Sequence, residues 1–200
     1  MPARGLLGGT YDPIHVAHLV VAETARADFG LERVVFMPAG NPPHKPERVV
    51  APASDRLRMV ELAVAGNPGF AVSSLEIERP GPSYTVDTLG RLLADEPGVE
   101  WHLIVGGDTL LEIPTWHEFR RLFLHAGLLV AARPGVELRI PRELEAVQER
   151  IRFFYPPALD LSASMIRQRL GRGLSVRYLV PPAVADYIGE HGLYKRAAGV

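Results

Sequence analysis

The sequence predicts an α/β fold: a doubly wound, mostly parallel sheet with helices on both faces. Short apolar runs alternate with amphipathic segments along the chain, which is typical of a parallel sheet covered by helices. The 200 residues are 47% hydrophobic and 22% charged, a size and composition that suit one domain with its own core. No internal repeat or linker interrupts the pattern. We therefore expect a single domain over residues 1–200 that ends in a small helical tail.

The first half of the chain contains three predicted strands, each followed by a predicted helix. Gly30 suits the position just past the first helix, and Ser54 is a residue type that caps a helix start. Two Pro/Gly-containing loops, Pro38–Pro52 and Arg79–Ser83, separate the units. We expect strands at Arg4–Gly8, Val34–Met37 and Phe70–Ile77, and helices at Val16–Phe29, Ser54–Ala65 and Thr85–Ala94.

The second half continues the alternation and adds the helical tail. Since the carboxyl ends of parallel strands meet at one edge of a sheet, we expect the ligand site there. We expect strands at Trp101–Val105, Leu128–Ala132 and Phe153–Tyr155, and helices at Arg142–Arg150, Ser164–Leu170 and Pro182–His191.

The composition excludes several classes of protein. The chain has no cysteine, which rules out a disulfide scaffold, a cysteine-ligated zinc site, an iron–sulfur cluster and a thiol nucleophile, and makes the cytoplasm the default location. Its 22 basic and 23 acidic residues give a net charge of -1, which argues against a dedicated nucleic-acid or anionic-membrane surface. No apolar run is long enough for a signal peptide or a membrane span. We expect neither secretion nor membrane insertion, and the oligomeric state stays open.

The segment Gly8–His18 joins the first predicted strand to the first predicted helix. Gly8 and Gly9 let backbone amides approach a ligand, and the helix start adds unpaired N–H groups and a partial positive charge. His15 and His18 are three residues apart, so a helix places both imidazoles on one face. This arrangement predicts a binding site for polyphosphate.

The same segment lacks two common phosphate-binding motifs. It contains neither a G-x-x-x-x-G-K-[ST] P-loop nor a G-x-G-x-x-G fingerprint, so a P-loop ATPase is disfavoured. For Asp12 we expect a role near the phosphates or in ordering the loop, and a turn-forming role remains open. The structural alternative is that the glycines only form a turn and that the histidines only cap the helix.

Taken together, the motifs closely resemble those of bacterial nicotinate mononucleotide adenylyltransferases, in the nucleotidyltransferase superfamily with the H-x-G-H signature. The resemblance covers nearly the whole chain. Ala17 stands where the signature has glycine, and Leu161, Ala163 and Ser164 depart from the I-S-S-T-x-I-R form of the last motif. The landmarks are Gly8–His18, Pro42–Lys45, Ser54–Met59, Ser83–Leu89, Gly106–Asp108, Thr115–Trp116 and Leu161–Arg167.

The resemblance implies a Rossmann-like fold and an adenylyl transfer from ATP to the 5′-phosphate of nicotinate mononucleotide. The products are nicotinate adenine dinucleotide and pyrophosphate, in the biosynthesis of NAD. By this analogy His18 contacts the α-phosphate in the transition state and His15 holds the triphosphate, assisted by Thr10 and by the backbone at Gly8 and Gly9. The protein aligns two anions and neutralises the charge that builds on the transferring group.

The later motifs add groups for ATP. By resemblance Arg167 grips the β- and γ-phosphates, where its planar fork gives two aimed hydrogen bonds, and the hydroxyls of Ser162 and Ser164 assist. Asp108 follows Gly106 at the end of a predicted strand and can accept from ribose hydroxyls. The structural alternatives are that a serine caps the helix, that Arg167 is a solvated surface residue, and that Asp108 caps the next helix.

Four residues are predicted to hold the acceptor. Trp116 can stack on a flat pyridine ring, although most tryptophans are core residues. By resemblance Thr85, with nearby backbone amides, receives the pyridine carboxylate, and a site made only of donors prefers the acid to the amide. His44 and Lys45 lie on the long loop, where they either close over phosphate or stay solvated.

Magnesium is expected with ATP, held mainly by substrate phosphates, and we assign no metal-binding residues. A zinc site built from Asp12, His15, His18 and His44 is the alternative. The histidine spacing and the absence of an H-E-x-x-H motif count against it.

Other functions remain in competition. Nicotinamide mononucleotide or phosphopantetheine could be the acceptor in the same superfamily, and the segment 83–88 with Thr115–Trp116 favours the pyridine nucleotide. A nucleotide sensor without activity would not need the transition-state histidine. The presence of His18 therefore disfavours a sensor. A metal-dependent phosphohydrolase would retain a tightly bound metal ion.

Overall fold

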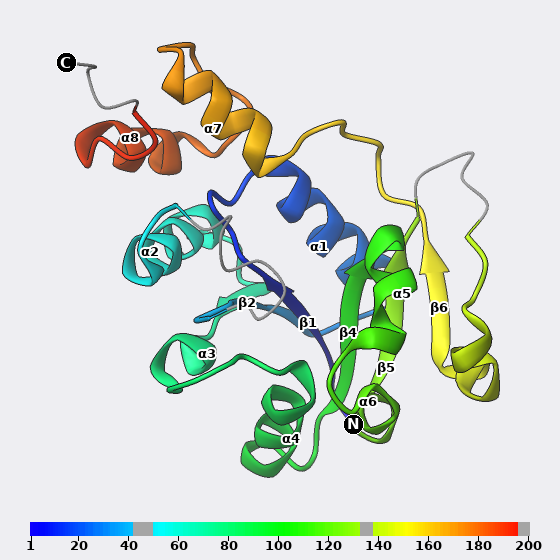
Figure 1. The fold of residues 1–200 in the computed structure, drawn as a ribbon. Coiled ribbons are helices and arrows are strands. Elements are labelled where there is room, and N and C mark those ends of the chain that lie inside the picture. Colours follow the sequence, from blue (N-terminus) through cyan, green and yellow to red (C-terminus); the bar gives the residue numbers. More distant parts are fainter. Residues whose placement is uncertain (42–49, 133–137, 196–200) are drawn as a thin grey trace.

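The computed structural model describes residues 1–41, 50–132 and 138–195. Six strands form one sheet in the order β3-β2-β1-β4-β5-β6 (Figure 1), and each neighbouring pair is parallel. This is the order of a doubly wound fold, in which the winding direction reverses between β1 and β4. The predicted fold class is confirmed. The strands are β1 Ala3–Gly9, β2 Arg33–Pro38, β3 Phe70–Val72, β4 Glu100–Gly106, β5 Ala126–Ala131 and β6 Ile151–Phe154.

Helices cover both faces of the sheet. Side chains alternate along a strand, so Leu7 belongs to one buried cluster and Leu6 to the other. The first cluster packs β1 against α1 Val16–Asp28, α2 Ala53–Val64, α7 Ala163–Gly171 and α8 Pro182–Glu190. The second cluster packs the sheet against α4 Thr85–Asp95, α5 Gly107–Glu112, α6 Phe119–His125 and the 3₁₀ segments η2 Ile113–Thr115 and η3 Arg142–Arg150. Figure 1 shows the two groups of helices on opposite sides of the strands.

The predicted elements hold except at a few positions. The strand predicted at Phe70–Ile77 stops at Val72, and a short helix, α3 Leu75–Glu78, replaces its second half. Pro52 rather than Ser54 is the N-cap residue of α2. The helix predicted at Arg142–Arg150 is present with those bounds and is a 3₁₀ helix. The short helices α5 and α6 were not predicted.

The carboxyl ends of β1 and β4 lie next to each other at the point where the winding reverses. The loops that leave them begin α1 and α5. None of the helices in the described part of the chain is long and apolar enough to span a membrane.

Candidate active site

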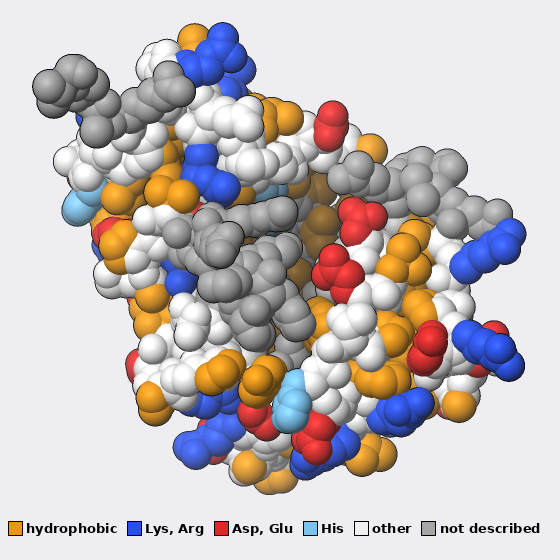
Figure 2. Space-filling view, viewed as in Figure 1, with side chains coloured by type: hydrophobic (Ala, Val, Ile, Leu, Met, Phe, Trp, Pro, Cys, Tyr) orange, Lys and Arg blue, Asp and Glu red, His pale blue; other side chains and the backbone are white. Residues whose placement is uncertain are grey.

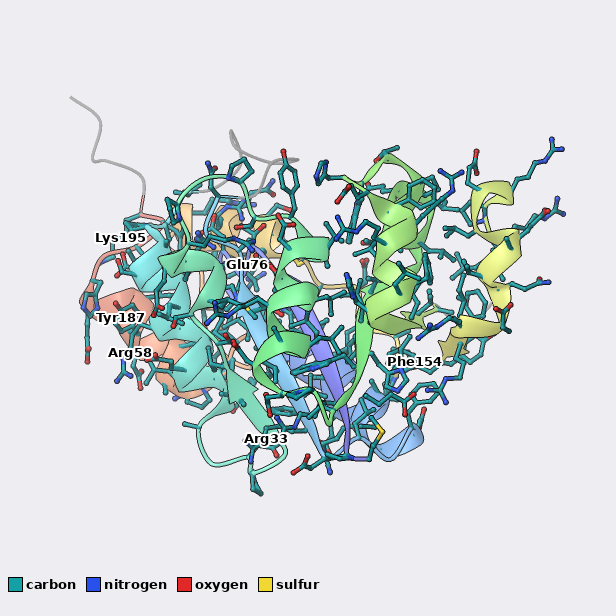
Figure 3. All side chains as sticks on the ribbon, turned by 90° about the horizontal axis from the view of Figure 1, so that it is seen from below. Arg33, Arg58, Glu76, Phe154, Tyr187 and Lys195 are labelled. Carbon is teal, nitrogen blue, oxygen red and sulfur yellow. The ribbon has the colours of Figure 1, made fainter. Side chains whose placement is uncertain are left out.

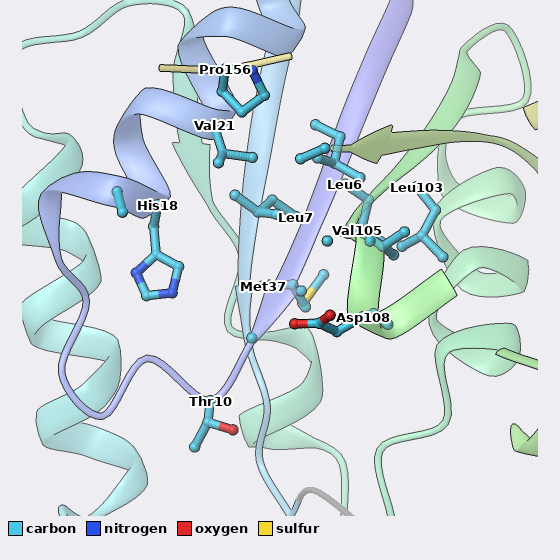
Figure 4. Close-up of a pocket in the computed structure, with 18 of the residues that line it drawn as sticks. Leu6, Leu7, Thr10, His18, Val21, Met37, Leu103, Val105, Asp108 and Pro156 are labelled. Atoms are coloured by element: carbon cyan, nitrogen blue, oxygen red, sulfur yellow. The ribbon is translucent and has the colours of Figure 1, made fainter. Parts of the chain in front are cut away.

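A cavity of about 670 Å³ opens at the carboxyl ends of β1 and β4 (Figure 4). Its volume lies in the ~300–1,000 Å³ range of small-molecule sites. In Figure 4 His18 and Asp108 lie on opposite sides of the close-up, and in Figure 2 acidic side chains border the hollow. The cavity brings together nine residues that the sequence predicts for the site: Gly8, Gly9, Thr10, His15, His18, Thr85, Gly106, Asp108 and Trp116.

The glycine loop is held by a buried arginine on α2. Nη1 of Arg56 donates to the carbonyls of Thr10 and Ala39, both at 2.7 Å, and Nη2 donates to the carbonyl of Gly40 at 3.2 Å. Arg56 is 1% exposed. One side chain therefore fixes both the loop after β1 and the loop after β2. The backbone at Gly8 borders open space, because a Cβ added there would meet no atom within 4 Å. The sequence places Arg56 in a recognised landmark but gives no sign of this role.

His15 and His18 lie together at the start of α1. Their rings stack with centroids 3.8 Å apart, and the backbone N–H of His15 donates to Nδ1 of His18 at 3.2 Å. Burial lowers the pKa of His15 to about 4. Burial is the main cause that holds the pKa of His18 well below its usual value, and the neighbouring His15 lowers it further. Both rings are therefore neutral at pH 7, and they lie on one face at the start of α1, as the sequence predicts.

The tautomer of His18 follows from its hydrogen bond. In neutral imidazole one nitrogen donates and the other accepts, and the bond at one fixes the role of the other. Because Nδ1 accepts from His15, Nε2 carries the proton and is free to donate toward a ligand. Within the described residues, Nδ1 of His15 is buried without a hydrogen-bond partner. The ring of His18 thus keeps a donor for a ligand, whereas the unpartnered nitrogen of His15 is buried.

Asp12 orders the chain around the loop instead of lining the cavity. Its carboxylate accepts from the backbone N–H of Val50 at 2.8 Å, from that of Ala51 at 3.1 Å and from the hydroxyl of Tyr194 at 2.7 Å. The side chain is 2% exposed. Both carboxylate oxygens of Asp12 already accept hydrogen bonds, and Asp12 is not among the residues that line the cavity, so the geometry supports the predicted loop-ordering role over the predicted role near the phosphates.

The residues of the last motif lie beside the cavity. Ser162 is the N-cap of α7 and accepts from the N–H of Met165 at 3.2 Å, and its hydroxyl lies 3.0 Å from that of Ser164. Arg167 lies in the second turn of α7 and donates to the carbonyl of Asp12 at 2.6 Å. The capping alternative for Ser162 is therefore realised, whereas Arg167 is not a free surface residue. None of the three is among the residues that line the cavity.

The remaining predicted residues fall into two groups. Asp108 lies in the first turn of α5, and Gly106, two residues before it, is the N-cap residue, so the alternative in which Asp108 caps this helix does not hold. His44 and Lys45 lie outside the described residues.

Several cavity residues were missed by sequence reasoning. Glu76 on α3 is 8% exposed and lines the cavity, and it lies well inside the outline of the molecule (Figure 3). The hydroxyl of Thr88 donates to it at 2.7 Å, and burial raises its pKa. The segment Pro156–Leu161, between β6 and α7, forms another part of the wall. The proline pair Pro156-Pro157 opens this segment, four residues before the motif that begins at Leu161.

Comparison with known proteins agrees with the geometry. A family model described as cytidylyltransferase-like matches residues 6–169. A probable nicotinate-nucleotide adenylyltransferase of Herpetosiphon aurantiacus is 48% identical, over 97% of this chain and 99% of its own. One of Thermomicrobium roseum is 43% identical, over 98% of this chain and 92% of its own.

A solved structure has the same fold. It is the Plasmodium falciparum nicotinic acid mononucleotide adenylyltransferase complexed with NaAD, with a TM-score of 0.77 at 18% identity over 97% of this chain and 98% of that one. At such identity the likeness concerns the fold alone. The full-length relatives carry the assignment further: this chain belongs to the cytidylyltransferase-like family and, within it, to the nicotinate-nucleotide adenylyltransferases.

Proposed function

We propose that this protein transfers the adenylyl group of ATP to the 5′-phosphate of nicotinate mononucleotide. An acceptor phosphate oxygen bonds to the α-phosphorus, the bond from that phosphorus to the bridging oxygen breaks, and pyrophosphate leaves. The observation that carries the proposal is the single cavity that joins a glycine loop and two neutral histidines to Thr85 and Trp116. The names of the full-length relatives support it.

The histidine side of the cavity suits the triphosphate. Nε2–H of His18 donates to the α-phosphate as charge develops there, and His15 gains a partner for its buried nitrogen. A neutral donor that is already oriented needs no reorganisation during the reaction. The N–H groups at the start of α1 and the backbone at Gly8 and Gly9 add to this positive cradle.

Arg167 is proposed to bind the β- and γ-phosphates. It already donates to the carbonyl of Asp12, next to the loop that lines the cavity. Ser162 and Ser164 present two hydroxyls 3.0 Å apart on the same helix start. Asp108, on the opposite wall from His18, is proposed to accept from the adenosine ribose.

The other end of the cavity is proposed to hold the acceptor. Trp116 gives a flat surface for the pyridine ring, and Thr85 with the first N–H groups of α4 gives donors for its carboxylate. Donors of this kind favour nicotinate over nicotinamide, because the amide would direct its own N–H groups at one of them. His44 and Lys45 are proposed to bind phosphate.

Magnesium is proposed to arrive with ATP. The described residues contain no cluster of three or more His, Asp or Glu side chains that could hold a metal ion by themselves. The oxygen donors of Asp108 and Thr10 in the cavity wall suit a hard cation that is shared with phosphates. Bound in this way, the ion neutralises phosphate charge.

The test is pyrophosphate release from MgATP with one acceptor at a time: nicotinate mononucleotide, nicotinamide mononucleotide or phosphopantetheine. A strong preference for the first supports both the reaction and the donor-only carboxylate site. Release with another acceptor would keep the chemistry and replace the substrate. Silence with all three would overturn the proposed function in favour of a sensor or a hydrolase.

A further inference from the structure

Two aromatic side chains meet across a gap between two chain segments near the predicted acceptor site. The rings of Tyr84 and His117 have centroids 4.4 Å apart and planes inclined by 32°. Tyr84 is the N-cap residue of α4, and His117 lies in the turn between η2 and α6. None of the functional roles described above involves either side chain.

Each member of the pair is next in sequence to a residue that lines the cavity. Thr85 follows Tyr84, and Trp116 precedes His117. The helices that begin after these residues, α4 and α6, pack against each other. The ring contact therefore joins the two segments that carry the proposed carboxylate donor and the proposed stacking surface.

Both segments are anchored at their backbones. The carbonyl of Tyr84 accepts from the backbone N–H of Thr88 at 3.2 Å. The N–H of Trp116 donates to the carbonyl of Ile113 at 2.9 Å, and Glu118 has a left-handed φ of 47°. Such a turn is costly for a residue other than glycine. Side-chain contacts across the gap help to hold it in place.

We propose that Tyr84 and His117 are positioning residues whose ring contact sets the spacing between Thr85 and Trp116 and thereby selects a flat aromatic acceptor. This rests on the proposed function. With the contact formed, the two walls are ordered before the ligand arrives. Without the contact, binding must order both segments, and the conformational entropy lost in that ordering weakens the affinity.

The effect falls on the acceptor alone. ATP is proposed to bind at the histidine side, which neither Tyr84 nor His117 touches. An aromatic pair contributes enough free energy to change an equilibrium roughly 2- to 13-fold. His117→Ala and Tyr84→Ala should each raise KM for nicotinate mononucleotide by about that factor and leave KM for ATP unchanged.

A double-mutant cycle tests the contact itself. Since either single substitution removes the whole interaction, the double variant should be no worse than the worse single variant. Tyr84→Phe keeps the ring and should behave as the wild type does. His191→Ala is the matched control, because His191 stacks on Tyr187 at 4.0 Å in α8, which contributes no residue to the cavity lining.

A binding titration keeps this inference separate from the proposed function. Tryptophan fluorescence reports the mononucleotide at Trp116 without turnover, since Trp101 is buried in the core. Weaker binding in both alanine variants supports the ring contact whatever the turnover. Unchanged or tighter binding, or additive effects in the cycle, overturns it. No binding by the wild type would overturn the contact's role and the proposed acceptor together, whereas binding without pyrophosphate release would overturn the activity alone.

Discussion

His15 donates its backbone N–H to Nδ1 of His18, and the two imidazoles stack 3.8 Å apart. The bond makes His15 responsible for the tautomer of His18, and the stacking makes a positive charge on either ring unfavourable for the other. Two histidines that are three residues apart on a helix thus act as one neutral, oriented unit. Their environment determines their protonation more than their residue type does.

His18→Ala should lower kcat strongly and leave KM for ATP within a few-fold. Removing one donor that acts on transition-state charge costs roughly 10²- to 10³-fold in rate. Steady-state pyrophosphate release measures both constants. His191→Ala, at the exposed residue that follows α8, should leave them unchanged, and wild-type turnover in the His18 variant would remove His18 from the mechanism.

Protein stability should fall on acidification through the titration of His15. Its folded pKa of about 4 lies below the ordinary histidine pKa of 6.5, so between these values the unfolded chain binds more protons. The stability present above pH 6.5 is therefore lost as the pH falls toward 4, by about 3 kcal/mol from this group. Urea unfolding at pH 7 and 4.5 measures the loss, which should be smaller in His15→Gln. Equal losses in both proteins would contradict the assignment.

Trp116→Ala should raise KM for the mononucleotide more than KM for ATP. The indole offers a flat contact area at low entropic cost, and it is proposed to stack on the pyridine ring and not to touch the triphosphate. Initial rates at varied concentrations of each substrate separate the two constants. Trp116→Phe keeps an aromatic surface and should lose less. Equal increases in both constants would contradict the stacking role.

Arg56→Lys should destabilise the fold by roughly 1–3 kcal/mol. The substitution keeps the charge but loses the fork that serves the carbonyls of Thr10, Ala39 and Gly40, and a buried acceptor without a donor costs about that much. Denaturant unfolding measures the change. Arg58→Lys on the same helix alters an exposed pair with Glu61 and should shift stability by less than ~0.5 kcal/mol. Equal shifts would show that burial of the fork is unimportant.

Tyr194→Phe should cost more stability than Tyr187→Phe. Each hydroxyl donates to an aspartate oxygen at 2.7 Å, Tyr194 to the buried Asp12 and Tyr187 to the more exposed Asp55. A hydrogen bond to a buried charge is worth roughly 1.5–3 kcal/mol, and the exposed pair well under that. Tyr187 lies near Arg58 at the outer edge of the molecule (Figure 3). Thermal unfolding of the two variants gives the comparison, and the reverse order would contradict it.

The strands were predictable because most of them are short runs of apolar residues that are buried on both faces. The error at Phe70–Ile77 has a local cause. Oγ of Ser73 accepts from the N–H of Leu75, and the carbonyl of Ser74 accepts from the N–H groups of Ile77 and Glu78. Such hydrogen bonds compete with a strand ladder. They turn an alternating sequence into the first turn of a helix, which periodicity alone does not reveal.

The site was predictable where its residues are close in sequence. Gly8 to His18 form a continuous segment, and the motif alone places them at the cavity. Asp12 and Arg56 are different, because their partners lie far away in the chain: Val50, Ala51 and Tyr194 for Asp12, and Ala39 for Arg56. No local pattern encodes such contacts. Glu76 was missed for the same reason, since only the folded sheet brings α3 to the cavity.

The reversal of winding between β1 and β4 also has a consequence for engineering. The glycine loop and the two histidines proposed to meet the α-phosphate come from one uninterrupted stretch, residues 8–18, whereas the proposed acceptor walls come from separate stretches around residues 83–88 and 113–118. The stretch 8–18 follows β1, whereas the two acceptor stretches belong to the β3–β4 and β4–β5 connections. The acceptor walls can therefore be exchanged as cassettes for those of a relative, and new acceptors can be explored without disturbing the machinery that activates ATP.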